Sequence, residues 1–131
     1  MITVPFPRWL RITAFAGFAV LLFVGTHWPQ LRIEGPIPRP DLVIHLVVFG
    51  MWALLLCVSG IFGEPGRLAT SSRCFGVGVV YAAFDESTQM IPALGRYAAM
   101  DDYLFNVIGL ALGTGLAMLV RTMPEPRSLG G

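Results

Sequence analysis

Ionisable and amide side chains recur at helical spacing in one part of an otherwise apolar sequence. Asp85 and Gln89 are four residues apart, Glu86 and Gln89 are three apart, and Asp102 and Asn106 are four apart. Residues three or four positions apart lie on the same face of a helix, so each set would present carboxyl and amide groups together. Such groups can accept hydrogen bonds from hydroxyl or cationic groups, and a carboxyl can act as a general acid or base.

Two more positions extend this polar set. His45 follows Asp41 by four residues at the start of an earlier apolar segment, and Arg96 lies in the short join between the two acidic runs. Histidine is a common general base, and arginine pairs well with carboxylate or phosphate. His45 and Glu86 are therefore candidate catalytic residues. The candidate ligand-binding residues are Asp41, His45, Asp85, Glu86, Gln89, Arg96, Asp102 and Asn106.

The sequence predicts neither a metal centre nor a cofactor. Cys57 and Cys74 lie in or beside apolar runs, where a disulfide between them is not expected, and two cysteines alone do not make a metal site. The histidine and carboxylates have the chemistry to hold a divalent metal, but the sequence does not show whether His45 lies near Glu86. Ser87 is the nearest hydroxyl nucleophile and has no obvious place in the set, which weakens a covalent enzymatic route.

The composition indicates that these polar groups belong to a membrane protein. Hydrophobic residues make up 55% of the chain, charged residues 13%, and the mean hydropathy is +0.70. Soluble domains carry about 25% charged residues. A soluble monomer of this composition would expose too much apolar surface. The net charge of +1 says nothing about nucleic acid, but no basic stripe runs along any predicted helix, so a nucleic-acid partner is not expected.

Four apolar segments, at residues 12–28, 42–62, 74–92 and 103–120, predict an all-α bundle of four transmembrane helices with short loops. A helix needs about 20 residues to cross the hydrocarbon core. The third segment reaches that length only if Asp85, Glu86 and Gln89 lie within it. The alternative is a helix that ends at Phe84, with the acids in a solvated loop. Residues 1–131 form one domain, of which 123–131 are expected to be a disordered tail.

The distribution of arginine predicts that both termini are cytoplasmic. With that orientation six arginines lie inside and three outside, as positively charged short loops favour. The first segment lacks a small-x-small cleavage site and is read as a span, not as a signal peptide. This orientation places the candidate ligand-binding residues in the outer half of the bundle. The expected location is the bacterial cytoplasmic membrane, crossed several times.

The fourth segment combines polar residues with glycines on one stripe. Asp102, Asn106, Gly109 and Gly113 follow one another at steps of four, three and four. Gly109 and Gly113, together with Gly115, would let a neighbouring helix approach closely, as small residues do in membranes. An alternative interpretation of Asp101 or Asp102 is a helix N-cap, although this would not explain Asn106.

The order and spacing of these residues resemble the VanZ-like family. The resemblance lies in Asp85-Glu86, Gln89, Arg96, Asp102, Asn106, Gly109 and Gly113, with Asp41 and His45 matching an earlier motif, and it extends from about Arg8 to Leu119. The sequence departs from the family pattern at Arg39-Pro40, at Leu42 and at Ala99-Met100. The family is named for an accessory factor in resistance to the antibiotic teicoplanin, so the resemblance implies a membrane protein of the cell envelope. Most relatives carry the fold without an assigned role, so antibiotic resistance does not transfer to this chain by default.

Four functions remain open at this point. The polar site could bind a membrane lipid, in particular a lipid-linked cell-wall precursor, or a glycopeptide. It could instead belong to a membrane-embedded enzyme acting on a lipid headgroup. A transporter is disfavoured, because the acids lie toward one face and transport needs a site near the midplane. Finally, the polar groups could have a purely structural role and hold the four helices together.

Overall fold

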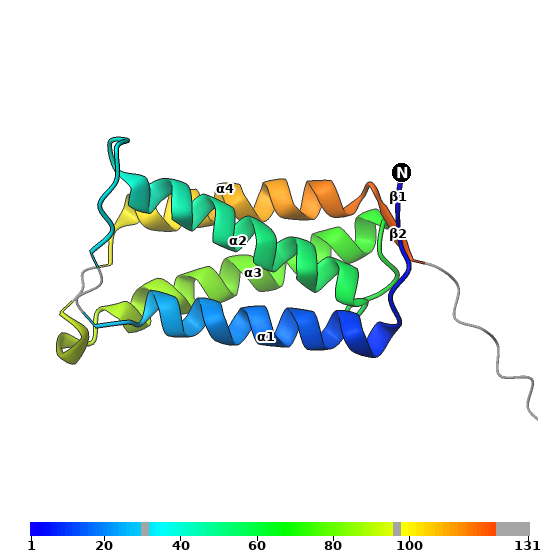
Figure 1. Ribbon diagram of the computed structural model, residues 1–131, viewed down its shortest axis with the longest axis horizontal. Coiled ribbons are helices and arrows are strands. Elements are labelled where there is room, and N and C mark those ends of the chain that lie inside the picture. Colours follow the sequence, from blue (N-terminus) through cyan, green and yellow to red (C-terminus); the bar gives the residue numbers. More distant parts are fainter. Residues whose placement is uncertain (30–31, 96–97, 123–131) are drawn as a thin grey trace, which may run out of the picture.

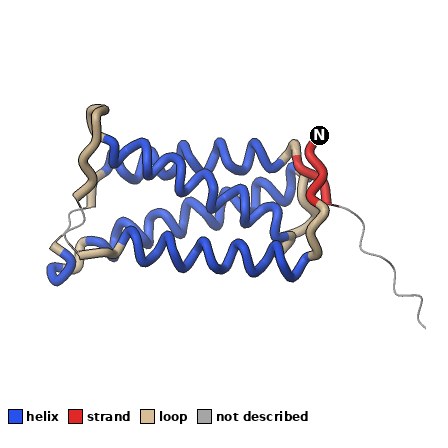
Figure 2. Tube along the Cα trace, in the orientation of Figure 1, coloured by secondary structure: helices blue, strands red, loops and turns tan. Residues whose placement is uncertain are grey.

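A computed structural model describes residues 1–29, 32–95 and 98–122. In order along the chain the elements are β1 (Ile2–Val4), α1 (Arg8–Thr26), α2 (Pro40–Ser59), α3 (Leu68–Gln89), the 3-10 helix η1 (Pro92–Leu94), α4 (Met100–Ala117) and β2 (Val120–Thr122). The four long helices lie side by side and alternate in direction (Figure 1). The part of the chain that is described is thus all-helical apart from the two short strands (Figure 2).

The first two helices begin and end at residues that stop helices. Pro7 precedes α1, and Pro40 is the first residue of α2, where a missing N–H costs nothing. Gly60 ends α2 in the left-handed conformation, with φ 76°. The helices therefore cover 8–26 and 40–59, each shifted a few residues toward the N-terminus relative to the apolar segments 12–28 and 42–62.

Helix α3 contains the acidic residues. It begins at Leu68, six residues before Cys74, and continues unbroken through Gln89. Asp85 and Glu86 are buried within it, at 0% and 5% exposure. The alternative of a helix ending at Phe84 with the acids in a solvated loop is therefore wrong.

The end of the chain's last helix differs from the expectation. Helix α4 ends at Ala117, not at Val120, and the next residues form β2, which pairs in parallel with β1. The register places Ile2 opposite Val120 and Val4 opposite Thr122. These β-branched residues favour extended structure, and pairing with the N-terminal strand gives their backbone groups partners outside a helix.

Two glycines of α4 lie against α2, with which α4 makes its most extensive contact. A Cβ on Gly109 would collide with the carbonyl oxygen of Leu46, and a Cβ on Gly113 would collide with that of Gly50. The backbones can approach closely because Gly50, Gly109 and Gly113 have no side chain there and Leu46 meets Gly109 through its main chain. Gly115 has nothing within 4 Å of an added Cβ, so the expectation that it also serves helix packing is wrong.

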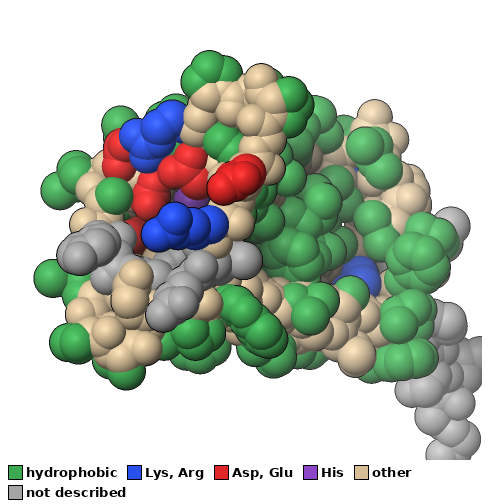
Figure 3. All heavy atoms as spheres, turned by 60° about the vertical axis from the view of Figure 1, so that its left-hand side comes forward, with side chains coloured by type: hydrophobic (Ala, Val, Ile, Leu, Met, Phe, Trp, Pro, Cys, Tyr) green, Lys and Arg blue, Asp and Glu red, His purple; other side chains and the backbone are tan. Residues whose placement is uncertain are grey.

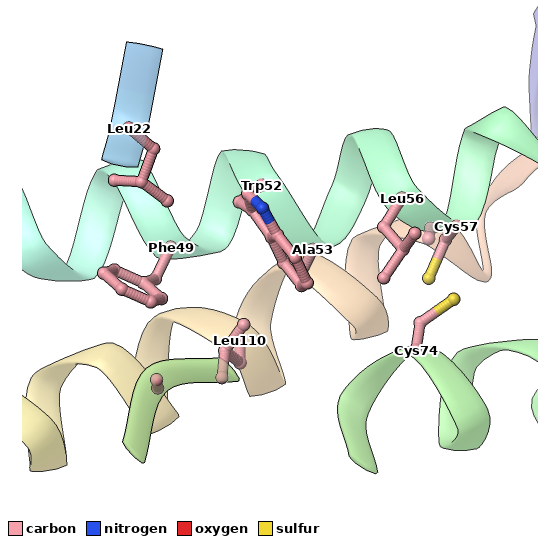
Figure 4. Close-up of a cluster of buried hydrophobic side chains, with 10 residues drawn as sticks. Leu22, Phe49, Trp52, Ala53, Leu56, Cys57, Cys74 and Leu110 are labelled. Carbon is pink, nitrogen blue, oxygen red and sulfur yellow. The ribbon is translucent and has the colours of Figure 1, made fainter. Parts of the chain in front are cut away.

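Aromatic and aliphatic side chains fill the space between the helices. Phe49 and Leu110 are fully buried, and Trp52 stacks on Tyr81 with ring centroids 5.0 Å apart. Cys57 and Cys74 are buried as free thiols, and Figure 4 shows their sulfur atoms turned toward one another between α2 and α3.

The outer surface of the bundle is apolar. Helices α1 and α2 are long and apolar enough to cross a membrane. Only 11% of the most apolar stretch of α1 is buried within the protein. Helix α1 therefore does not resemble the core helix of a soluble protein, which would be mostly buried. Exposed apolar side chains also occur on α3 and α4, including Val80, Phe84, Leu112 and Leu116. The fold is therefore that of a helical protein suited to a membrane environment.

Candidate functional site

The polar residues collect at one end of the bundle, where α1 and α3 end and α2 and α4 begin. Figure 3 shows acidic and basic side chains together at this end, with a histidine between them, next to a flank covered by hydrophobic side chains. The reason is topological, because helices that alternate in direction bring the ends of odd-numbered helices to the starts of even-numbered ones. Residues as far apart in the sequence as Arg39 and Asp101, which are separated by 62 positions, form hydrogen bonds there.

Three of the helices contribute to a buried group that we call the His45 cluster: His45, Glu86, Asp102 and Asn106. Asn106 is fully buried at its centre. Its Nδ2 donates to Glu86 Oε1 at 3.0 Å, and its Oδ1 lies 2.8 Å from His45 Nδ1. Asp102 Oδ2 is 3.9 Å from His45 Nε2. Asn106 therefore joins α2 to α3 from its position on α4.

The hydrogen bonds of Asn106 indicate which ring nitrogen of His45 carries the hydrogen in the neutral imidazole. An ionised carboxylate only accepts hydrogen bonds, so the amide nitrogen must face Glu86 and the amide oxygen must face His45. His45 Nδ1 then carries a hydrogen and donates it to Asn106. In a neutral imidazole this leaves the lone pair on Nε2, the nitrogen that faces Asp102.

Two carboxylate oxygens of the cluster have no hydrogen-bond partner among the described residues. They are Glu86 Oε2 and Asp102 Oδ1. Buried oxygens of this kind are costly unless something donates to them or coordinates them. The cluster therefore has unused capacity to accept hydrogen bonds or to bind a cation.

Asp85 belongs to a separate network, which we call the Asp85 network: Thr26, His27, Asp85, Thr88 and Gln89. Thr26 Oγ1 donates to Asp85 Oδ1 at 2.8 Å, and Gln89 Nε2 donates to Asp85 Oδ2 at 2.9 Å. His27 Nε2 lies 2.7 Å from Thr88 Oγ1. Both oxygens of Asp85 thus accept hydrogen bonds within the protein, whereas among the described residues only one oxygen of Glu86 does so. The network joins the end of α1 to α3.

A third, exposed group surrounds Arg39. Its Nη1 donates to Asp101 Oδ2 at 2.6 Å and its Nη2 donates to Asp41 Oδ2 at 3.2 Å. The hydrogen bond from Arg39 lowers the pKa of Asp101, and the hydrogen bonds to Asp41 and Asp101 raise the pKa of Arg39. Arg39 Nη2 also lies 3.7 Å from Asp102 Oδ1, so this group borders the His45 cluster.

The predicted site residues are therefore distributed among these three groups. His45, Glu86, Asp102 and Asn106 come together, whereas Asp85 and Gln89 form a neighbouring network and Asp41 remains at the surface with Arg39. Arg96, the expected counter-charge, lies outside the described residues; the described arginine that faces the acids is Arg39. The N-cap of α4 is Ala99, so neither Asp101 nor Asp102 is the cap.

Sequence reasoning missed Thr26, His27 and Thr88. They could have been found from their positions at the ends of the first and third apolar segments. Thr26 and His27 close the first apolar segment, so any alternating bundle would place them beside the end of the third helix, where Asp85 and Thr88 lie. Gly50 was also missed, because its role depends on the close approach of α4 rather than on any motif.

An apolar groove between α1 and α2 leads to the polar end. It has a volume of about 220 Å³, and its apolar lining includes Leu22, Ile44 and Val48. Thr26 and His45 also line it. Glu86 lines a second, more open hollow between α3 and the start of α4, together with Ser87 and Tyr103. The His45 cluster is thus reached from both sides.

Comparison with known proteins agrees with this picture. A sequence model of the VanZ/LLP1 family matches residues 3–121, nearly the whole chain. No curated protein and no solved structure gives a significant match. The matched region contains all four helices and every residue of the His45 cluster and the Asp85 network. The chain belongs to the VanZ/LLP1 family.

Proposed function

We propose that this protein spans the bacterial cytoplasmic membrane four times, with both termini in the cytoplasm, and binds the polar headgroup of a cell-envelope ligand at its outer end. The observation that carries the proposal is the His45 cluster, where four polar side chains from three helices converge and two buried carboxylate oxygens accept no hydrogen bond from the described residues. A ligand that donates hydrogen bonds would satisfy both oxygens.

The chemistry of the cluster favours a headgroup rich in hydroxyl or amino groups. Glu86 and Asp102 supply acceptors for such groups, and Asn106 holds Glu86 in place through its amide. Arg39, at the border of the cluster, offers a positive charge to any phosphate nearby. A lipid-linked cell-wall precursor and a lipoglycopeptide both combine sugar hydroxyls with an apolar chain.

The groove between α1 and α2 supports a lipid as the occupant. Its apolar lining lies against exposed apolar surface of two membrane-length helices, and it ends at Thr26 and His45. A chain lying in the groove would bring its headgroup to the cluster without leaving the bilayer. We therefore propose a lipid-linked ligand, whose tail follows the groove and whose headgroup meets His45.

The proposal is tested in cells by antibiotic susceptibility. The wild type, Glu86→Gln and Glu64→Gln would be expressed at equal membrane abundance in a sensitive Gram-positive host, and teicoplanin and vancomycin susceptibility measured side by side. Glu64 is exposed, pairs with Arg67 and lies at the opposite end of the bundle, so it is a matched control. We expect protection against teicoplanin from the wild type and from Glu64→Gln, and none from Glu86→Gln.

Lipid profiling of the purified proteins separates the ligand from the resistance role. A lipid that co-purifies with the wild type and with Glu64→Gln, but not with Glu86→Gln, would support the binding proposal even if no strain were protected. Equal lipid content in all three proteins would contradict it. Chemical conversion of a bound lipid by the wild type alone would instead establish the enzymatic alternative, with His45 as the nearest base.

A further inference from the structure

The His45 cluster has the donor set of a metal site. His45, Glu86 and Asp102 each offer one ligand atom, and these three atoms all lie within 4.8 Å of one another. One imidazole nitrogen and two carboxylate oxygens suit Zn²⁺, Mn²⁺ or Co²⁺. In a tetrahedral site with bonds of about 2.1 Å, ligand atoms are roughly 3.4 Å apart. The three ligand atoms would therefore have to move closer together on binding an ion.

Asn106 prepares His45 for this role. By accepting the hydrogen of Nδ1 it leaves the lone pair on Nε2, which faces Asp102 Oδ2 at 3.9 Å. A metal-bound histidine usually donates its other N–H to a neighbouring oxygen in this way. The same amide donates to Glu86 Oε1 and fixes the second ligand. Asn106 therefore orients two of the three candidate ligands.

The free oxygens are available to coordinate a cation. Glu86 is only 5% exposed, and its Oε2 has no hydrogen-bond partner among the described residues. In the neutral imidazole, the lone pair of His45 Nε2 and the oxygen Asp102 Oδ2 are two acceptors that lie 3.9 Å apart. Lone pairs arranged in this way repel unless a proton or a cation lies between them. Arg39 approaches the cluster at Asp102 Oδ1, at 3.7 Å, and among the described residues no arginine pairs with Glu86 or with Asp102 Oδ2.

We infer that His45, Glu86 and Asp102 bind one divalent transition-metal ion, with Asn106 as the residue that positions His45 and Glu86. Three protein ligands leave at least one coordination position for an outside atom. Because His45 also lines the groove between α1 and α2, that atom would be a headgroup oxygen, from phosphate or from a sugar hydroxyl. This inference extends the proposed function and rests on it for the identity of the outside ligand, but the metal site itself can be tested separately.

The test is metal binding by the full chain in detergent. The protein, purified with a tag that contains no histidine and stripped with a chelator, would be dialysed against Co²⁺ and against Zn²⁺, and bound metal measured by mass spectrometry and visible absorption. We expect one ion per chain and a rise in unfolding temperature with metal, because an ion that binds only the folded state stabilises it. Absence of both would overturn the inference.

Matched variants locate the ion. Asp102→Asn and His45→Gln should lose binding, whereas Asp101→Asn and His27→Gln should retain it, since Asp101 pairs with Arg39 and His27 lies in the Asp85 network. Asn106→Ala should weaken binding by about 10- to 100-fold, as expected for a residue that orients ligands. Binding that survives in both Asp102→Asn and His45→Gln would overturn the inference. Metal-free unfolding temperatures show which variants are folded, and Asp102, partly exposed at 13%, tolerates substitution better than His45.

Failure of the metal inference can be distinguished from failure of the proposed function. If no metal binds but Glu86→Gln still loses its co-purifying lipid, the cluster binds its ligand without an ion. If metal binds in the wild type and not in Asp102→Asn, while lipid content is the same in every variant, the metal site stands and the lipid proposal falls.

Discussion

Asp85 and Glu86 are adjacent in the sequence, yet their carboxylates belong to different networks. Asp85 accepts from Thr26 of α1, whereas Glu86 accepts from Asn106 of α4. Successive residues on a helix point about 100° apart, so one turn of α3 can face two neighbours at once. The two carboxylates therefore differ in their hydrogen bonds. Both oxygens of Asp85 accept a hydrogen bond, while Glu86 Oε2 accepts none from the described residues. Both oxygens of Asp85 are therefore already paired, whereas Glu86 keeps one oxygen that could accept a hydrogen bond from a ligand.

Removal of the Asn106 amide should destabilise the protein. In Asn106→Ala, both His45 Nδ1 and Glu86 Oε1 lose a buried partner. Each orphaned group costs about 1–3 kcal/mol. Thermal unfolding in detergent should show a clear drop in stability. Thr114→Val is the control, because the Thr114 hydroxyl is also buried in α4 but donates only to carbonyls of its own helix. A drop no larger than in the control would contradict the account.

The glycines of α4 should differ in their tolerance of alanine. Gly113→Ala places a methyl group against the carbonyl oxygen of Gly50, so α4 must move away from α2. Overpacking of this kind costs about 1–3 kcal/mol. Gly115→Ala meets nothing within 4 Å and should be neutral or slightly stabilising. Membrane abundance and unfolding temperature check both; equal tolerance at the two positions would be inconsistent with the packing described.

The bond between Thr26 and Asp85 should tie α1 to α3. Thr26 Oγ1 donates to Asp85 Oδ1 at 2.8 Å across 59 residues of sequence. Hydrogen bonds between membrane helices contribute about 0.6 kcal/mol on average. A double-mutant cycle with Thr26→Val and Asp85→Ala, which removes the acceptor that an asparagine would keep, should give a coupling free energy of about this size. A coupling indistinguishable from zero would show that the two residues do not interact.

Loss of Arg39 should strengthen cation binding. Its guanidinium lies 3.7 Å from Asp102 Oδ1 and repels a cation held by that carboxylate. Arg39→Gln should therefore raise the affinity for Co²⁺ severalfold, most clearly at low ionic strength. Arg67→Gln, which removes an arginine paired with Glu64 at the other end of the bundle, should have no effect. Weaker binding in Arg39→Gln would mean that Arg39 supports the site instead of opposing it.

The proposed orientation predicts opposite labelling of two loops. Glu34 lies between α1 and α2, at the polar end, and Glu64 lies between α2 and α3, at the other end. On a background with Cys57 and Cys74 replaced by alanine, Glu34→Cys should react with a membrane-impermeant maleimide in intact cells. Glu64→Cys should react only after permeabilisation. The reverse pattern would place the His45 cluster on the cytoplasmic side.

Much of the architecture could be predicted because it depends on local properties. Apolar segments of sufficient length, interrupted by proline and glycine, predict four helices, and helical spacing places Asp102, Asn106, Gly109 and Gly113 on one stripe. The family resemblance is confirmed by the match over residues 3–121. Helix ends were less predictable: α3 begins at Leu68, within a polar stretch that hydropathy alone does not mark as helical.

The partition of the polar residues could not be predicted, because it depends on which helices become neighbours. Nothing in the sequence indicates which neighbouring helix supplies the hydrogen-bond donor for Asp85 or for Glu86. Only the packing of the helices pairs Asp85 with α1 and Glu86 with α4. The same holds for Asp41, which shares a helical face with His45 by spacing but pairs with Arg39 at the surface. Side-chain partners across helices are a tertiary property, which periodicity does not encode.

The most direct test of the central claim compares thermal unfolding of the wild type and Glu86→Gln with and without a purified lipid-linked cell-wall precursor. Because glutamine keeps the size of the side chain and its acceptor for Asn106, we expect the two proteins to unfold at similar temperatures without lipid. The precursor should then raise the unfolding temperature of the wild type alone. If Glu86→Gln is already destabilised without lipid, and the precursor shifts both proteins equally or neither, the cluster holds the helices together and is not a ligand site.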